Sequence, residues 1–236
     1  MIGEFFRNIL TYPLLNLLVF FYNYIPDIGI VIILLTVLTR LLLLPSFHKG
    51  MKHQKELQDL QPKMNEIKQK YKDDKERQAK ALMELYSVHK VNPLSSCLPV
   101  LIQLPILIAL YQVFIKALGG QALEGLYPFV PNPGAINVVF LGFLNLAQKN
   151  VILAGLAAVL QYFQSKMMLS KKQASQDPTA KMMSIQTLYV LPGLTFIFGL
   201  QFPAGLTLYW AASTLFGIVQ QYYFLKKEAR VLIESK

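Results

Sequence analysis

Long apolar runs alternate along this chain with polar or proline-containing turns. The run from Gly29 to Pro45 is apolar apart from two threonines and Arg40. A helix of about 20 residues crosses the roughly 30 Å hydrocarbon core of a bilayer, and this run together with the residues just before it is long enough. Further apolar runs cover about Pro93–Ile115, Val151–Leu169, Met182–Leu200 and Pro203–Leu225. The pattern predicts an all-α polytopic membrane protein with five transmembrane helices.

Two apolar stretches are interrupted and do not count among these spans. Phe5–Phe21 contains four polar side chains and Pro13, which predicts a broken helix lying in the membrane interface. The alternative is an extra span that forms a tight hairpin with the next helix through Pro26 and Asp27. Lys116–Asn150 carries three prolines and an apolar patch too short to cross, so we expect a loop that dips into the interface.

A charged segment follows the first span and has a heptad-like pattern. Apolar residues recur at intervals of three and four, and a second short stripe holds Ala79, Leu82 and Tyr86 beyond Asp73–Asp74. The pattern predicts an antiparallel helical hairpin standing off the membrane. With few apolar layers, such a hairpin should be mobile. The first stripe consists of Leu57, Leu60, Met64, Ile67 and Tyr71.

These elements define five consecutive parts of the chain. They are the N-terminal interfacial helix at 1–28, the first span at 29–45, the hairpin at 46–92, the remaining four spans at 93–225 and a short basic tail at 226–236.

The composition supports a membrane protein. Hydrophobic residues make up 54% of the 236 positions and charged residues 15%, against roughly 25% charged in soluble domains. The single cysteine excludes an internal disulfide or a multi-cysteine metal site, and the three histidines lack metal-ligand spacing. No nucleotide-binding glycine motif and no nucleophile–base set is present, so we expect no cofactor, no metal and no enzymatic activity.

The net charge of +10 sets the orientation. Lys and Arg number 11 in Ser46–Asn92, 4 in Lys166–Lys181 and 4 in Leu225–Lys236, against 3 on the opposite side. By the positive-inside rule the N-terminus lies outside, and the hairpin and the C-terminus lie in the cytoplasm. Because topology explains the charge, specific nucleic-acid binding is not required.

Arg40 is the anomaly of the first span. A charge inside the bilayer costs about 2.5–3.5 kcal/mol or more, and no Asp or Glu lies in any predicted span to pair with it. One explanation is snorkelling, in which the side chain reaches the nearer headgroups. Other polar side chains share its depth, which predicts instead a water-filled cavity open to the cytoplasm and closed by apolar outer helix halves. They are Thr36, Gln103, Gln161, Gln164 and Gln220. Taken singly, Gln103 and Gln220 are explained equally well by hydrogen bonds between helices.

Four motifs in the chain resemble one known family. They read TVLTRLLLLP from Thr36, LQPKMNEIKQKY from Leu60, VNPLSSCLPVLIQLPILIALY from Val91 and FPAGLTLYW from Phe202. In this order they resemble the YidC/Oxa/Alb membrane protein insertases, and the likeness covers about Gly29 to Leu225.

The resemblance implies a hydrophilic groove facing the cytoplasm. Arg40 would supply its positive charge, flanked by Thr36, and Tyr209 with Trp210 would contact the substrate. The hairpin would receive substrates or targeting partners. The large periplasmic domain of many relatives and the lipid-attached cysteine of others are absent from this sequence, and the short tail argues against a ribosome contact through a long basic extension.

We therefore expect an insertase of the bacterial inner membrane whose partners are nascent membrane proteins and the lipid bilayer. The ribosome, the signal recognition particle pathway and the Sec translocon are further candidate partners. A small-anion transporter that uses Arg40 is the alternative, although it predicts an inverted repeat that five spans do not provide. An inert assembly scaffold would leave Arg40 unexplained.

Overall fold

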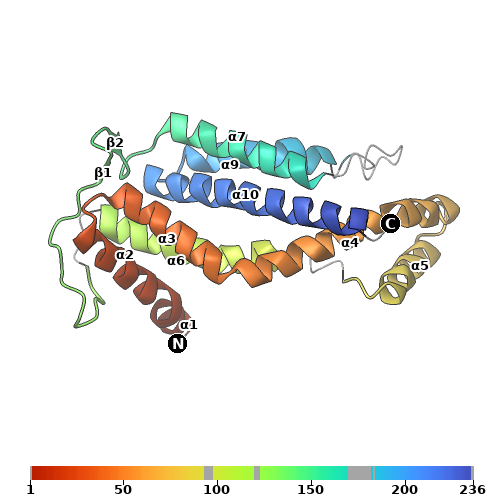
Figure 1. Ribbon diagram of the computed structural model, residues 1–236, viewed down its shortest axis with the longest axis horizontal. Helices are drawn as coiled ribbons and strands as arrows, with labels where there is room; N and C mark the ends of the chain where they lie inside the picture. The colour runs from red at the N-terminus through yellow and green to blue at the C-terminus, as the bar shows by residue number, and fades with distance from the viewer. Residues whose placement is uncertain (1, 93–97, 120–122, 170–181, 183, 235–236) are drawn as a thin grey trace.

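A computed structural model describes residues 2–92, 98–119, 123–169, 182 and 184–234, and these residues are mostly helical. Figure 1 shows α10 running between α7 and α3, with α4 and α5 extending beyond one end of the bundle. The elements in chain order are α1 (Ile2–Phe6), η1 (Arg7–Thr11), α2 (Tyr12–Tyr24), α3 (Ile28–Leu42), α4 (Leu44–Lys70), α5 (Lys75–Val88), α6 (Leu98–Leu118), β1 (Val139–Phe140), β2 (Leu144–Asn145), α7 (Val151–Met168), η4 (Gln186–Val190), α9 (Leu191–Gly199) and α10 (Ala204–Glu234).

The N-terminal helix is continuous, so the break expected at Pro13 is wrong. Proline lacks an N–H, and its ring clashes with the carbonyl one turn earlier in a regular α-helix. The wider π-helical turn η1 ends just before Pro13 and accommodates this defect. The same arrangement recurs in η4, which ends just before Pro192 at the start of α9.

Helix lengths agree with the predicted spans to different degrees. Gly3–Tyr24 and Val151–Met168 are long and apolar enough to cross a membrane, and Ile28–Leu42 joined to Leu44–Leu57 is a third candidate with a 64° bend. Two further apolar helices, Gln103–Leu118 and Gln186–Gly199, are shorter. The first of these belongs to the span expected from Pro93, whose opening residues 93–97 lie outside the described residues.

The last helix does not end with the last predicted span at Leu225. The backbone of α10 continues as one helix to Glu234, so residues 226–234 lengthen the helix. The boundary placed between the fourth and fifth parts of the chain is therefore not a break in secondary structure. Five residues in the last three turns are basic or acidic, and a helix can carry them out of the membrane without changing its backbone.

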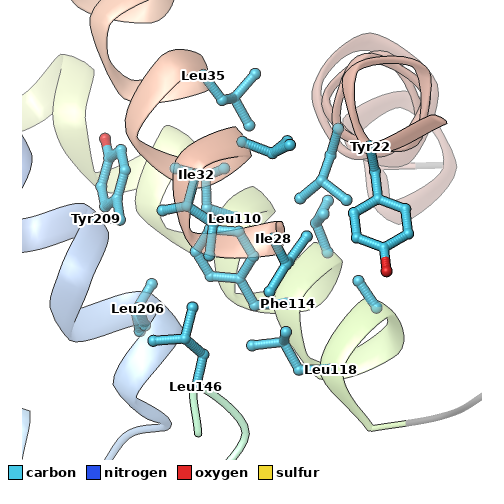
Figure 2. Packing of buried hydrophobic residues seen from close by; sticks show 14 of the residues in the cluster. Tyr22, Ile28, Ile32, Leu35, Leu110, Phe114, Leu118, Leu146, Leu206 and Tyr209 are labelled. Atoms are coloured by element: carbon cyan, nitrogen blue, oxygen red, sulfur yellow. The ribbon is translucent and has the colours of Figure 1, made fainter. Parts of the chain in front are cut away.

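Helix α3 lies at the centre of the packed core. Its fully buried residues contact α2 on one side and α6 and α10 on the others (Figure 2). Between membrane helices this packing is stabilised mainly by van der Waals contact, because lipid tails are as apolar as the side chains. The main participants are Leu15, Leu18, Ile28, Ile32, Leu35, Leu110, Phe114, Leu118, Leu146, Leu206 and Tyr209.

The segment 123–150 is anchored on the helices rather than free. β1 and β2 form a short antiparallel hairpin, a departure from the all-α prediction. Asp27 accepts hydrogen bonds from Gly29 N and Ile30 N at the start of α3, and its other oxygen accepts one from Leu141 N at 2.9 Å. Gly29 is buried under the Phe140 ring, which occupies the space that a Cβ would need.

The same segment is bound along α2. Asn16 donates to Gly125 O at 2.9 Å and accepts from Tyr127 N at 2.6 Å, and Asn23 donates to Pro131 O at 2.9 Å. These contacts place the helix and the loop at the same level along the bundle. The length of Gly3–Tyr24 fits the alternative of an extra span, whereas its contacts with the loop fit an interfacial position.

Helices α4 and α5 form the predicted antiparallel pair (Figure 1). In the first stripe Leu60 is buried and the other four residues are half-buried. The second stripe is partly wrong: Ala79 is exposed, and the side of α5 turned inward consists of Gln78, Ala81, Leu82, Leu85 and Tyr86. A polar residue takes the inner position because the Gln78 amide donates to Lys68 O at 3.0 Å and so covers the end of α4.

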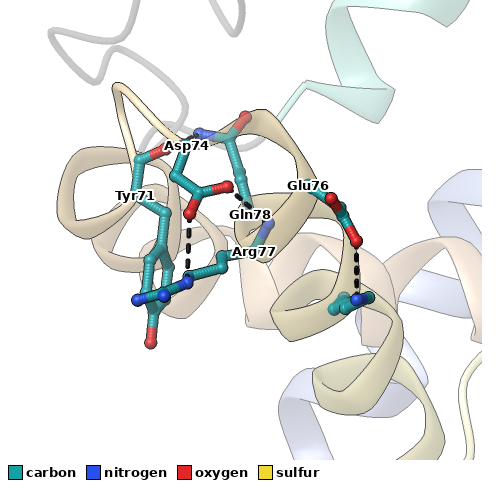
Figure 3. Close-up of polar contacts among 6 residues, drawn as sticks. Tyr71, Asp74, Glu76, Arg77 and Gln78 are labelled. Carbon is teal, nitrogen blue, oxygen red and sulfur yellow. Dashed lines mark hydrogen bonds and ion pairs between the residues drawn. The ribbon is translucent and has the colours of Figure 1, made fainter.

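The turn between the two arms is stabilised locally (Figure 3). Asp74 caps α5 by accepting from Arg77 N at 3.0 Å, and its second oxygen pairs with the Arg77 guanidinium at 3.1 Å. Asp74 N donates to Tyr71 O at 3.2 Å. A cap of this kind contributes about 1 kcal/mol, so the turn is well defined although the hairpin has few apolar layers.

Candidate functional site

Arg40 lies near the end of α3 and points to α10. Its Nε and Nη2 both donate to Ser213 Oγ, at 2.8 and 2.5 Å. Ser213 is buried and belongs to α10, 173 residues away in the sequence. The acceptor of the guanidinium is therefore a neutral hydroxyl, which leaves the positive charge of Arg40 without a counter-ion at this contact.

A second contact connects α10 to α6 beside Arg40. The Gln103 amide donates to the phenol oxygen of Tyr209 at 2.5 Å. Tyr209 stands one helical turn before Ser213, so both contacts lie on the same face of α10. We call these four residues the polar cluster: Arg40, Ser213, Tyr209 and Gln103. Three helices supply it, and the predicted residues Arg40, Tyr209 and Gln103 are among its members.

Thr36 is one turn from Arg40 but is fully buried. Its hydroxyl donates to Ile32 O at 2.7 Å within its own helix. A threonine bonded in this way satisfies its own polar group and needs no water. The structure therefore places Thr36 beneath the polar cluster and not on an open surface.

The other predicted site residues lie around α10. Gln161 is half-buried on α7, and the hydrogen bonds and ring contact described for Arg40 involve Ser213 and Phe47 instead. Trp210 is half-buried and follows Tyr209 directly, so it points about 100° away around the helix. Gln220 is buried on α10, and its Nε2 has no hydrogen-bond partner among the described residues.

The polar cluster contains no carboxylate. Helices α3, α6, α7 and α9 contain no Asp or Glu, and α10 has none before Glu228. An aromatic ring also contacts the guanidinium. Arg40 Cζ lies 4.6 Å from the centroid of the Phe47 ring. The positive charge of Arg40 is thus held by a hydroxyl and a ring, which leaves it able to attract an anion.

Two members of this arrangement do not stand out in the sequence. Ser213 sits in a run of small residues, and Phe47 begins the charged segment that follows the first span. The only available signal for Ser213 is its spacing of four from Tyr209, which places two polar side chains on one face of an apolar helix. For Phe47 there is no signal, because its position depends on the bend between α3 and α4.

The comparisons with known proteins identify one family. The family model described as 60Kd inner membrane protein matches residues 20–230. Among curated relatives, Membrane protein insertase YidC of Geobacter metallireducens is 36% identical over 229 residues, covering 93% of this chain and 37% of that protein. The protein of the same name from Geobacter sulfurreducens is 38% identical over 220 residues, covering 91% of this chain and 36% of the relative. The chain thus spans little more than a third of the length of these relatives.

A solved structure is similar as well. It is described as "Active YidC insertase crystal structure with the first transmembrane domain resolved" and is 28% identical, with a TM-score of 0.63. The similarity covers 90% of this chain and 45% of that one. The overall arrangement of the helices is therefore similar to that of this solved structure.

Proposed function

Because the chain belongs to the 60Kd inner membrane protein family of YidC-type insertases, we propose that it inserts nascent membrane proteins into the bilayer through a hydrophilic groove that opens to the cytoplasm. The observation that carries the proposal is Arg40, a charge in a membrane helix with a hydroxyl and a ring as its partners. An intramembrane charge without a counter-ion marks a path for polar groups.

A second observation supports water in this region. The Nε2 of Gln220 is buried without a partner, and such a donor costs about 1–3 kcal/mol if it stays dry. Gln220 lies seven residues beyond Ser213 along α10, about 10 Å closer to the hairpin end. A chain of water from the cytoplasmic side would satisfy Gln220 first and then reach the polar cluster.

The mechanism follows from the physics of the bilayer. A polar tail must cross about 30 Å of hydrocarbon, and a water-filled inner half shortens the apolar part of that path. Arg40 attracts acidic residues of the tail for as long as they are in transit, because it has no fixed carboxylate to release. The apolar segment that follows moves from the groove into lipid, where burial of its surface drives the step. No nucleotide hydrolysis is needed.

The proposed mechanism requires one orientation of the chain in the inner membrane and implies its partners. The segment 123–150 and the N-terminal helix lie on the outer side, while the hairpin α4–α5 and the end of α10 lie in the cytoplasm, as the distribution of basic residues requires. Nascent membrane proteins and the bilayer are the partners. The ribosome, the signal recognition particle pathway and the Sec translocon would deliver substrates to the hairpin.

Insertion into liposomes that contain only this chain is the experiment that tests the function. A single-span substrate with an acidic tail is synthesised in their presence, and its inserted fraction is measured by protection of the membrane fragment from added protease. We expect a larger protected fraction than in empty liposomes, without any nucleotide present at the insertion step. Equal fractions in both would contradict the proposal.

Thiol labelling tests whether the groove opens inward only. With Cys97 replaced by serine, single cysteines at Gln103 and Gln161 should react with a membrane-impermeant reagent added from the cytoplasmic side, because both positions are half-exposed. A cysteine at Thr36 should react far more slowly, since that side chain is fully buried. Mass spectrometry of the labelled protein gives the rates.

Two exposed positions provide the controls for sidedness. A cysteine at Asn132 should react only from the outside and one at Ser87 only from the cytoplasm. Labelling of position 103 at similar rates from both sides would favour the small-anion transporter, because a transport pathway must open to each side in turn.

A further inference from the structure

Phe47 occupies the face of the Arg40 guanidinium. Its ring centroid lies 4.6 Å from Arg40 Cζ, within the range of a cation–π contact. Ser213 uses two of the five N–H donors of the guanidinium, which leaves three for another acceptor. An incoming carboxylate would have to approach these donors beside a ring that is already stacked on the charge.

Phe47 reaches this position because the chain bends between α3 and α4. The two helices meet at 64° around Leu43, and Phe47 N donates to Leu43 O at 3.0 Å in the first turn of α4. Pro45 supplies no N–H to the carbonyl one turn earlier, so the helical hydrogen bonding is interrupted at this point. A break of this kind is where a helix can change direction with little loss of hydrogen bonds.

The next residue ties the same turn to α10. The His48 ring lies 6.1 Å from the ring of Phe224, centroid to centroid. The first turn of α4 thus contacts Arg40 and Phe224, and α4 also contacts α6, while the far part of the hairpin extends away from the bundle (Figure 1). Movement of the hairpin about Leu43 would remove Phe47 from Arg40 and His48 from Phe224 together.

From this geometry we propose that Phe47 is a cover for Arg40 that opens with the hairpin, so that an acidic substrate segment reaches the guanidinium only when α4 has swung away. The inference rests on the proposed insertase function and adds regulation to its site. Phe47 and the substrate compete for the same face of the Arg40 guanidinium, and the position of the hairpin determines which of them binds there.

Chemical modification of Arg40 tests the cover directly. The purified full chain in liposomes is treated with phenylglyoxal, a small arginine-selective reagent, and modification at each arginine is followed by mass spectrometry. We expect Phe47→Ala to raise the rate at Arg40 by about three- to thirtyfold, the range that a cation–π contact gives to an open–closed equilibrium. Arg77, exposed on the hairpin, is the internal reference and should not change.

Two variants separate the ring from general loosening of the hairpin. Phe47→Tyr keeps the ring and should react like the unaltered chain. Leu57→Ala truncates a half-buried residue farther along α4 and should also leave the rate at Arg40 unchanged. An unchanged rate in Phe47→Ala, or an equal increase in Leu57→Ala, would overturn the proposal.

A cross-link provides a second measurement that does not alter Phe47. With Cys97 replaced by serine, cysteines at His48 and Phe224 are joined by a short cleavable thiol cross-linker, which holds the first turn of α4 on α10. Modification of Arg40 should slow and should recover when the linker is cleaved. A rate indifferent to the cross-link would refute the cover. These rates are read without substrate, so a failure of the insertase function would appear separately, as equal insertion in liposomes with and without the chain.

Discussion

Replacing Arg40 by alanine should lower insertion of a substrate with an acidic tail by about ten- to a hundredfold, whereas Arg40→Lys should retain much of the activity. Hydrogen bonds to a charged group contribute about 1.5–3 kcal/mol, which corresponds to this factor. Lysine keeps the positive charge and can still donate to Ser213 Oγ, the acceptor that Arg40 uses. The measurement is the protease-protected fraction of substrate in liposomes, at equal amounts of reconstituted variant.

The controls for this experiment vary the substrate. Tails whose acidic residues are replaced by asparagine or glutamine should depend far less on Arg40, because a neutral amide gains little from the field of the guanidinium. Several tails are needed, since individual substrates differ in their demand for the charge. Equal activity of the alanine and lysine variants on acidic tails would show that the charge has no role.

The hairpin is the second place where a large effect is expected. Replacing Leu60 and Met64 together with aspartate should unfold it and lower insertion. Leu60 is the most buried residue of the first stripe, and Met64 accepts a hydrogen bond from Tyr86 of the opposite arm. Carboxylates placed there cost at least about 3 kcal/mol, more than a pair of short helices can supply in water. Limited proteolysis of the hairpin and insertion are measured on the same preparation.

A matched variant adds the same charge to the outside of the hairpin. Gln69 and Ser87 are exposed on its two arms, so Gln69→Asp with Ser87→Asp should leave both protease resistance and insertion intact. The transmembrane core should survive in both variants, because its cluster of buried residues contains no residue of the hairpin. If the hairpin of the buried variant became protease-sensitive while insertion stayed normal for every substrate, capture by the hairpin would be wrong.

These two experiments concern sites on either side of the bend between α3 and α4. Arg40 lies just before the bend at Leu43, and the hairpin begins just after it. If Phe47 covers Arg40, the hairpin and the arginine act together, because substrate binding by the hairpin uncovers Arg40.

Local physics determined much of the fold from the sequence. Apolar runs of sufficient length predict membrane helices, and the described parts of α3, α6, α7, α9 and α10 all lie within or overlap those runs. The three–four spacing on the first arm predicts which residues face inward, and Leu60 is buried as the spacing requires. Arg40 stands out for the same reason, because a charge in an apolar run is visible without any knowledge of its neighbours.

Two local predictions failed because a contact or turn elsewhere compensated for an unfavourable residue. Pro13 reads as a helix breaker, yet the π-helical turn before it absorbs the missing hydrogen bond. In the second arm, Ala79 matched the apolar period but Gln78 lies inside, because its amide finds a carbonyl at the end of α4. A hydrogen bond to a distant backbone atom is invisible in a pattern of apolar and polar residues.

The partners of Arg40 were decided only by the tertiary structure. Thr36 is its neighbour in the sequence, but it is buried and bonded within its own helix. Ser213 lies 173 residues away and accepts from the guanidinium, and Phe47 stacks on it through the bend at Leu43. A sequence pattern reports the direction of a side chain relative to its own helix axis. Which hydroxyl or ring stands opposite depends on how the helices pack and bend, and this only the folded chain determines.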